Sequence, residues 1–148
     1  MSFLQERQKQ AVIIKTNLPE VLHGFCFLAI PRPGQSEIDQ IHTYLNGNEH
    51  YIPIEQSSDQ KTLLIAKQSI VSIELSLQKI KLDPLVQKTK TQIMLHDKSQ
   101  LECELSLDGP PGKQRISDIL NNSNTFLEIW ITHRLLFLNK QFVYKICL

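Results

Sequence analysis

The chain has 148 residues, of which 41% are hydrophobic, enough for one ordinary core or two small ones. Its 16 Lys and Arg side chains nearly balance 15 Asp and Glu, so a net charge of +1 gives no electrostatic reason to expect nucleic acid or an anionic membrane as a partner. The sequence contains neither a signal-peptide core nor an apolar run of membrane-spanning length, and we therefore expect a cytoplasmic protein.

The first half of the chain reads as short strands interrupted by one helix. β-branched and apolar runs predict strands at residues 11–16, 22–30, 51–54, 63–66 and 70–75. The Pro- and Gly-containing segment 31–34 stops the second strand. Ser36 then starts a helix, because it is followed by isoleucine and leucine at helical spacing.

The second half repeats this order. Residues 62–75 align without a gap on residues 135–148, so that Lys67 and Lys140 fall in the same tight turn between the last two strands. Upstream, the alternating series Leu22, Gly24, Cys26 and Leu28 matches Leu101, Cys103, Leu105 and Leu107. Both series carry a small residue at the second position, where a bulky side chain is not expected to fit. The sequence therefore predicts two tandem copies of one supersecondary unit.

These patterns predict a fold class and a division of the chain. We expect an N-terminal tail at 1–10, repeat one at 11–75, a linker at 76–90 and repeat two at 91–148. Five strands and one short inserted helix per repeat predict an α+β, mainly β protein. Each repeat is expected to be a small bent five-stranded barrel-like unit of the Sm-like or SH3-like type. A flat two-layer α+β sandwich is the alternative.

Two surfaces follow from this interpretation. The strand at 22–30 is apolar on both faces, and we expect the extra face, with Phe25 and Phe27, to be covered by the other repeat or by another subunit. The chain ends inside the last strand, so the side chains of 146–148 are expected in the core of repeat two.

The three cysteines are interpreted as structural. Cys26, Cys103 and Cys147 are odd in number and far apart, and each lies in an apolar, strand-like run. This predicts small buried residues of a reduced protein and not a disulfide framework. A CxxC motif and a Cys/His cluster are both missing, and the five histidines are not at metal-binding spacing. The sequence therefore predicts no metal and no cofactor.

One stretch of the second half resembles a known family. Residues 112–121 read Gly-Lys-Gln-Arg-Ile-Ser-Asp-Ile-Leu-Asn, and residues 137–143 read Phe-Leu-Asn-Lys-Gln-Phe-Val. This series resembles a family of uncharacterised bacterial proteins, a domain of unknown function with a proline-glycine turn, an Arg-Leu/Ile-Ser-Asp-x-Leu-Asn motif and a closing hairpin. The resemblance implies a bacterial protein and this fold unit, but no activity.

The same motif supplies the candidate site. Arg115, Ser117, Asp118 and Asn121 form the sharpest polar cluster of the chain, with Arg115 and Asp118 three residues apart on a helix. The functional interpretation is a small ligand or partner site. The structural interpretation, which we favour, is that Ser or Asp caps the helix and Asn ends it.

No catalytic motif is present. The sequence lacks a P-loop, a GxGxxG loop and a GxSxG elbow, and Glu102 and Glu104 would raise the pKa of the Cys103 thiol instead of activating it. We therefore expect a non-catalytic binding or regulatory module that acts through a protein partner or through self-association. The alternative is an Sm-like RNA-binding protein that uses the lysines at 79–90 and the aromatic residues Trp130, Phe142 and Tyr144. An enzyme ranks third.

Overall fold

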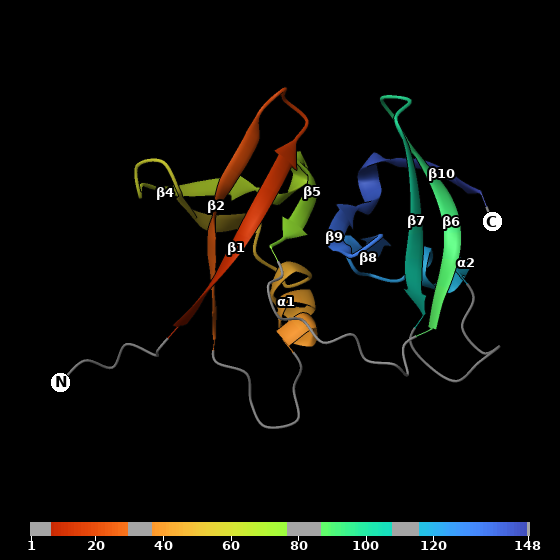
Figure 1. Ribbon diagram of the computed structural model, residues 1–148, viewed down its shortest axis with the longest axis horizontal. Coiled ribbons are helices and arrows are strands. Elements are labelled where there is room, and N and C mark those ends of the chain that lie inside the picture. The colour runs from red at the N-terminus through yellow and green to blue at the C-terminus, as the bar shows by residue number, and fades with distance from the viewer. Residues whose placement is uncertain (1–6, 30–36, 77–86, 108–115, 148) are drawn as a thin grey trace. The chain divides into compact units, whose positions relative to one another are not determined.

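The computed structural model describes residues 7–29, 37–76, 87–107 and 116–147 (Figure 1). The chain divides into two compact units, Met1–Ser76 and Leu77–Leu148. In the described residues, each unit consists of antiparallel strands with one short α-helix and one 3₁₀ turn.

The first unit contains β1 (Arg7–Thr16), β2 (Val21–Ala29), α1 (Glu37–Leu45), β3 (Tyr51–Gln56), β4 (Thr62–Ala66), the 3₁₀ turn η1 (Lys67–Ser69) and β5 (Ile70–Leu75). Its strands are hydrogen-bonded in the order β5-β1-β2-β3-β4. β1 and β2 form a long hairpin with nine paired residues, whereas β2 and β3 share only two pairs.

The second unit contains β6 (Gln87–Leu95), β7 (Gln100–Leu107), α2 (Ile116–Asn121), β8 (Phe126–Ile131), β9 (Arg134–Asn139), the 3₁₀ turn η2 (Lys140–Phe142) and β10 (Val143–Cys147). Its strands follow the order β10-β6-β7-β8-β9. Again the first two strands form a long hairpin, with eight pairs, and again only two pairs join β7 to β8.

The predicted barrels are wrong. Within the described residues, no ladder joins β4 to β5 or β9 to β10, so the strands of each unit form an open antiparallel sheet and not a closed barrel with an inserted helix. Of the predicted fold class, only the mainly β content is confirmed. Alternation of side chains indicates a strand and its buried face, but closure depends on strand tilt and stagger, which alternation does not encode.

Most strands lie where the sequence predicts them. β5 has the predicted bounds, and the turns at Lys67 and Lys140 are short 3₁₀ turns. Two strands start several residues earlier than predicted. β1 starts at Arg7, inside the segment 1–10 predicted as a tail, and β6 starts at Gln87, inside the segment interpreted as a linker. β1 continues upstream because it pairs with β2 as far as Arg7, and β6 is explained in the same way. Its first half is polar, and it is a strand because it pairs along its length with β7.

Alternate side chains of each sheet form the core. In the first unit these are Val12, Ile14, Leu22, Cys26, Leu28, Ile52, Ile54, Ile73 and Leu75, joined by Ile41 and Leu45 of α1. In the second unit they include Ile93, Cys103, Leu105, Phe126, Ile129, Leu135 and Phe137. The period of two therefore selects the buried face in both sheets.

The end of the chain differs from its prediction. β10 pairs with β6 alone among the described strands, and Ile146 is only half-buried while Cys147 is exposed. The expectation of a core position is wrong for both residues, because β10 lies at an edge of the sheet. Leu148 lies outside the described residues.

One lysine in each unit holds the C-terminal end of its helix. Lys140, the first residue of η2, donates from Nζ to the backbone oxygen of Ile119 at 2.6 Å, in the last turn of α2. Lys67, the first residue of η1, donates in the same way to the backbone oxygen of Gly47 at 3.0 Å, just past α1. Both ammonium groups satisfy carbonyls that a helix end leaves without a partner, and their positive charge opposes the negative end of the helix dipole.

A close backbone approach explains the small residue predicted in β2. A Cβ atom on Gly24 would lie 2.4 Å from the backbone oxygen of Glu55 and 2.7 Å from Cγ2 of Ile54. Gly24 pairs with Gln56 in the two-residue ladder between β2 and β3, so the approach occurs where the two hairpins of the unit meet. Only glycine fits without moving β3.

We expect Gly24→Ala to lower the free energy of unfolding by about 1–3 kcal/mol, because the added methyl group would push against a backbone carbonyl. Denaturant unfolding followed by circular dichroism measures the change. Gly47→Ala is the matched control, since the nearest atom there is a carboxylate oxygen of the exposed Glu49 side chain at 2.9 Å and not a backbone atom. Equal losses in the two variants would contradict the close approach.

We expect Lys140→Ala to cost about 1–2 kcal/mol of stability, because the Ile119 carbonyl loses a charged donor at the helix end. The same unfolding measurement tests this. Lys145→Ala removes an equal charge from an exposed position of β10 and should change stability by less than about 0.5 kcal/mol. If Lys145→Ala lowered the free energy of unfolding as much as Lys140→Ala, the loss would come from the removed charge and not from the bond to the helix end.

Candidate functional site: a groove in the second unit

The polar cluster predicted from the sequence lies on α2. Ser117, Asp118 and Asn121 are all exposed, and the Nδ2 atom of Asn121 donates to the backbone oxygen of Ser117 at 2.8 Å. Asn121 thus makes a bond within its own helix. Arg115 lies outside the described residues, so its place in the cluster stays a prediction.

A groove of about 550 Å³ opens elsewhere, on the sheet of the second unit. Its lining comes from β6, β7, β8 and β10 and includes Lys90, Gln92, Glu102, Glu104, Trp130 and Cys147. The strand registers explain why these side chains meet. Lys90 is paired with Glu104 and Gln92 with Glu102 in the β6–β7 ladder, and Glu104 is paired with Trp130 in the β7–β8 ladder. Paired residues project to the same face, which is opposite to the core face.

Trp130, the only tryptophan of the chain, forms one wall of the groove. Its side chain is almost entirely buried, with 5% exposed, and its indole Nε1–H donates to Oγ of Ser106 at 3.0 Å. The ammonium nitrogen of Lys88 lies 4.0 Å from the centre of the ring. The hydrogen bond and the cation–π contact therefore fix the indole in place.

The charged side chains of the groove are unevenly matched. Two glutamates face one lysine in the lining, a net charge of −1. Within the part of the chain that the structure describes, neither Glu102 nor Glu104 takes part in a salt bridge. The amide nitrogen Nε2 of Gln92 donates a hydrogen bond to Oε1 of Gln100 at 2.8 Å and not to a glutamate of the groove. The two carboxylates and the Lys90 ammonium are thus the charged groups that line the groove.

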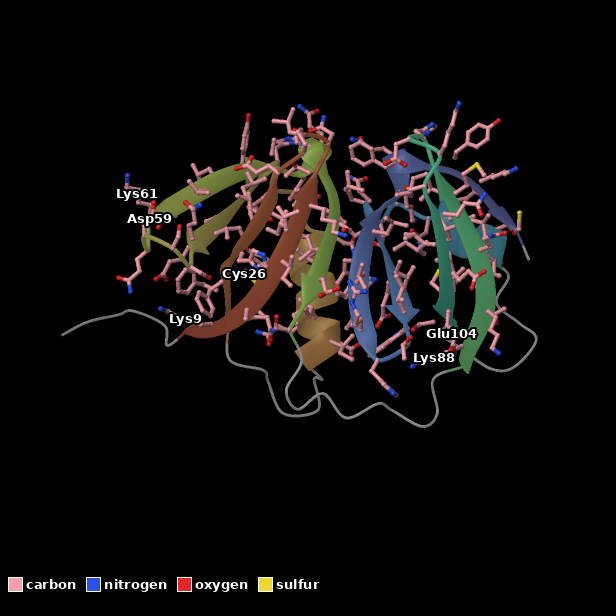
Figure 2. All side chains as sticks on the ribbon, turned by 45° about the horizontal axis from the view of Figure 1, so that its top comes forward. Lys9, Cys26, Asp59, Lys61, Lys88 and Glu104 are labelled. Carbon is pink, nitrogen blue, oxygen red and sulfur yellow. The ribbon has the colours of Figure 1, made fainter. Side chains whose placement is uncertain are left out.

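The registers also show what occupies the corresponding face of the first unit. Phe25 is paired with Glu55 as Glu104 is paired with Trp130, and Lys9 is paired with Phe27 as Lys88 is paired with Ser106. Figure 2 shows Lys9 and Lys88 near the start of the first strand of each unit. The two faces can therefore be compared position by position.

In the first unit this face is filled by its own side chains. The ammonium nitrogen of Lys9 lies 5.6 Å and 5.8 Å from the ring centres of Phe25 and Phe27, and 3.3 Å from Oε2 of Glu55. The extra apolar face predicted for this strand is thus covered in part by a lysine of its own unit, and its covering by the other repeat or another subunit stays a prediction. In the second unit, Glu104 and Ser106 replace the two phenylalanines, and the groove lies beside them.

Sequence reasoning passed over this site. Glu102 and Glu104 alternate with buried residues, which indicates an exposed outer face and nothing more. What links them to Trp130 is the pairing of β7 with β8, across an intervening helix. A sole tryptophan on a strand that also carries buried aliphatic residues was the available signal.

Comparisons of the chain with protein-family models, with curated proteins and with solved structures found no match. Neither α1 nor α2, the helices of the described residues, is long and apolar enough to cross a membrane. The same residues contain no group of three or more His, Cys, Asp or Glu side chains placed to hold a metal ion. The candidate site therefore stands on its geometry.

The cysteines differ in their surroundings. Burial raises the pKa of the Cys26 thiol to about 12, and burial, with a contribution from Glu104, raises the pKa of Cys103. Cys147 is exposed at the edge of the groove, so the prediction of a buried residue is confirmed for Cys26 and Cys103 and wrong for Cys147. All three are free thiols.

We expect iodoacetamide at pH 8 to alkylate Cys147 of the native protein at least tenfold faster than Cys26 or Cys103, because only the accessible thiolate reacts. Mass spectrometry of tryptic peptides measures the three rates. In denaturant the rates should converge. Native Cys26 reacting as fast as Cys147 would contradict the burial.

The buried Cys26 thiol also makes stability depend on pH. Its pKa is about 12 in the folded protein and 9.0 for an unperturbed thiol, so its contribution to the free energy of unfolding is lost as the pH rises from 9 towards 12.

Proposed function

We propose that this protein is a non-catalytic binding module that works by self-association through the free edge of β4. The observation that carries the proposal is an edge strand without the features that normally prevent pairing. β4 is the last strand of its series and pairs with β3 alone among the described strands. Edge strands usually carry a charge, a proline or a bulge that prevents further pairing.

None of these features is present in β4. Its sequence, Thr-Leu-Leu-Ile-Ala, holds no charge and no proline, and its five pairs with β3 run without a register shift. Lys67 follows directly, but its ammonium group is held by the backbone oxygen of Gly47. The strand therefore presents regular, unprotected hydrogen-bonding groups.

An apolar surface accompanies the edge. Leu64 is 69% exposed and Tyr51 is 57% exposed. The pairs Tyr51–Ala66 and Pro53–Leu64 place these four side chains on one face of the β3–β4 hairpin. A single contact that covers this face and pairs the edge would remove exposed apolar surface from water and would also give the free backbone groups of β4 hydrogen-bond partners.

A second copy of the chain fits this edge. Antiparallel pairing about Leu64 would set Leu63 opposite Ile65 of the second copy and Thr62 opposite Ala66 of the second copy, with no charge in any pair. The contact is isologous, so the same patch serves both copies and the assembly closes as a dimer. Buried free thiols at Cys26 and Cys103 support a reducing, cytoplasmic setting.

RNA binding, the alternative predicted from the sequence, is not proposed. It depended on an Sm-like barrel, and the open strand order removes that basis. Trp130 is only 5% exposed and its ring carries the Lys88 ammonium, so it is poorly placed to stack on a base.

Light scattering coupled to size-exclusion chromatography tests the proposal. We expect twice the chain mass of 17.1 kDa for the wild-type protein and a single chain mass for Leu64→Lys, whose new charge lies at the centre of the contact. Leu18→Lys is the matched control, because Leu18 is equally exposed but lies in the β1–β2 turn, and it should remain a dimer. A wild-type protein that stays monomeric at about 1 mM, or a dimer that survives Leu64→Lys, would overturn the proposal.

A further inference from the structure

We propose that the groove of the second unit binds an organic cation, a guanidinium or alkylammonium group, between Glu102 and Glu104 and beside the indole of Trp130. The inference is independent of self-association, because it concerns a different unit and a different set of strands.

The spacing of the carboxylates suits one cation. Glu102 and Glu104 are two residues apart on β7, so their side chains leave the same face about 7 Å from each other. A guanidinium group between them can donate to both. The net charge of −1 in the lining favours a positive ligand over a negative one.

In the first unit, the carboxylate on the corresponding face is paired with a lysine of the same unit. There the Lys9 ammonium pairs with Glu55 above two aromatic rings. The groove retains a carboxylate and an aromatic ring, but Glu104 stands where Phe25 stands in the first unit. Lys90 lies opposite Glu104 in the β6–β7 ladder, but among the described residues Glu104 forms no salt bridge like that of Lys9 with Glu55. A cationic ligand would give Glu104 the partner that Lys9 gives Glu55.

Lys88 shows that the indole accepts a positive charge. Its ammonium nitrogen lies 4.0 Å from the ring centre, within the range of a favourable cation–π contact. Lys88 does not line the groove itself, so this contact can persist while a ligand lies on the carboxylate side. A volume of about 550 Å³ is within the usual range for small-ligand pockets and accommodates a cation with several methylene groups.

The indole N–H resonance of Trp130 provides the test, because one tryptophan gives one assignable signal. Three probes are titrated: agmatine, N-acetylarginine N-methylamide and N-acetylcitrulline N-methylamide. Citrulline replaces the guanidinium with a neutral urea of nearly the same shape. We expect the two guanidinium probes to shift the resonance with millimolar Kd and the citrulline probe to leave it unchanged.

Variants locate the contact. Glu102→Gln and Glu104→Gln should each weaken binding about two- to fivefold, the range for a solvent-exposed charge pair. Lys90→Gln should tighten binding, because it removes the cation opposite Glu104. Glu20→Gln is the matched control, since it removes the same charge from an exposed turn of the first unit. Leu64→Lys should bind the probes as the wild type does.

The outcomes separate the sources of the cation. Tighter binding of the arginine amide than of agmatine would assign the groove to a basic side chain within a polypeptide. Equal or tighter binding of agmatine would assign it to a free organic cation. A citrulline shift equal to that of arginine, no shift with either guanidinium probe, or equal weakening by Glu20→Gln and Glu104→Gln would overturn the proposal.

Discussion

Each unit depends on a ladder of only two residue pairs that joins its long first hairpin to its second. In the first unit these pairs are Gly24–Gln56 and Phe25–Glu55, and in the second they are Glu104–Trp130 and Leu105–Ile129. So short a ladder leaves little hydrogen bonding to hold the hairpins in register, and packing must do the rest. In the first unit, the glycine at position 24 lets the β3 backbone approach β2 closely beside this ladder. The sheet face next to the ladder carries aromatic rings in the first unit and a groove in the second.

The sequence predicts strands well because strand formation is a local property. β5 has the bounds that β-branched and apolar residues indicate. Barrel closure and the burial of Ile146 could not be predicted in the same way. Both depend on which strands lie side by side, and an apolar residue on an edge strand has the same local sequence as one in the centre of a sheet.

The candidate site was predicted less well than the fold. The polar residues of α2 stand out in the sequence because they are close together, but in the structure Ser117 and Asn121 are linked by a bond within the helix. The groove joins Glu104 to Trp130, which are 26 positions apart in the sequence, through a ladder that alternation alone does not specify. A site whose residues come together only when distant strands pair therefore leaves no local sequence motif, whereas a site on one helix does.

The lysines that hold the helix ends also couple events far apart along the chain. Lys67 reaches a carbonyl 20 residues before it, and Lys140 reaches one 21 residues before it, with a whole β-hairpin between in each case. Helices of nine and six residues are too short to persist alone in water. Each helix therefore depends on contacts with the rest of its unit, and one of these contacts is a lysine that follows the next hairpin in the sequence.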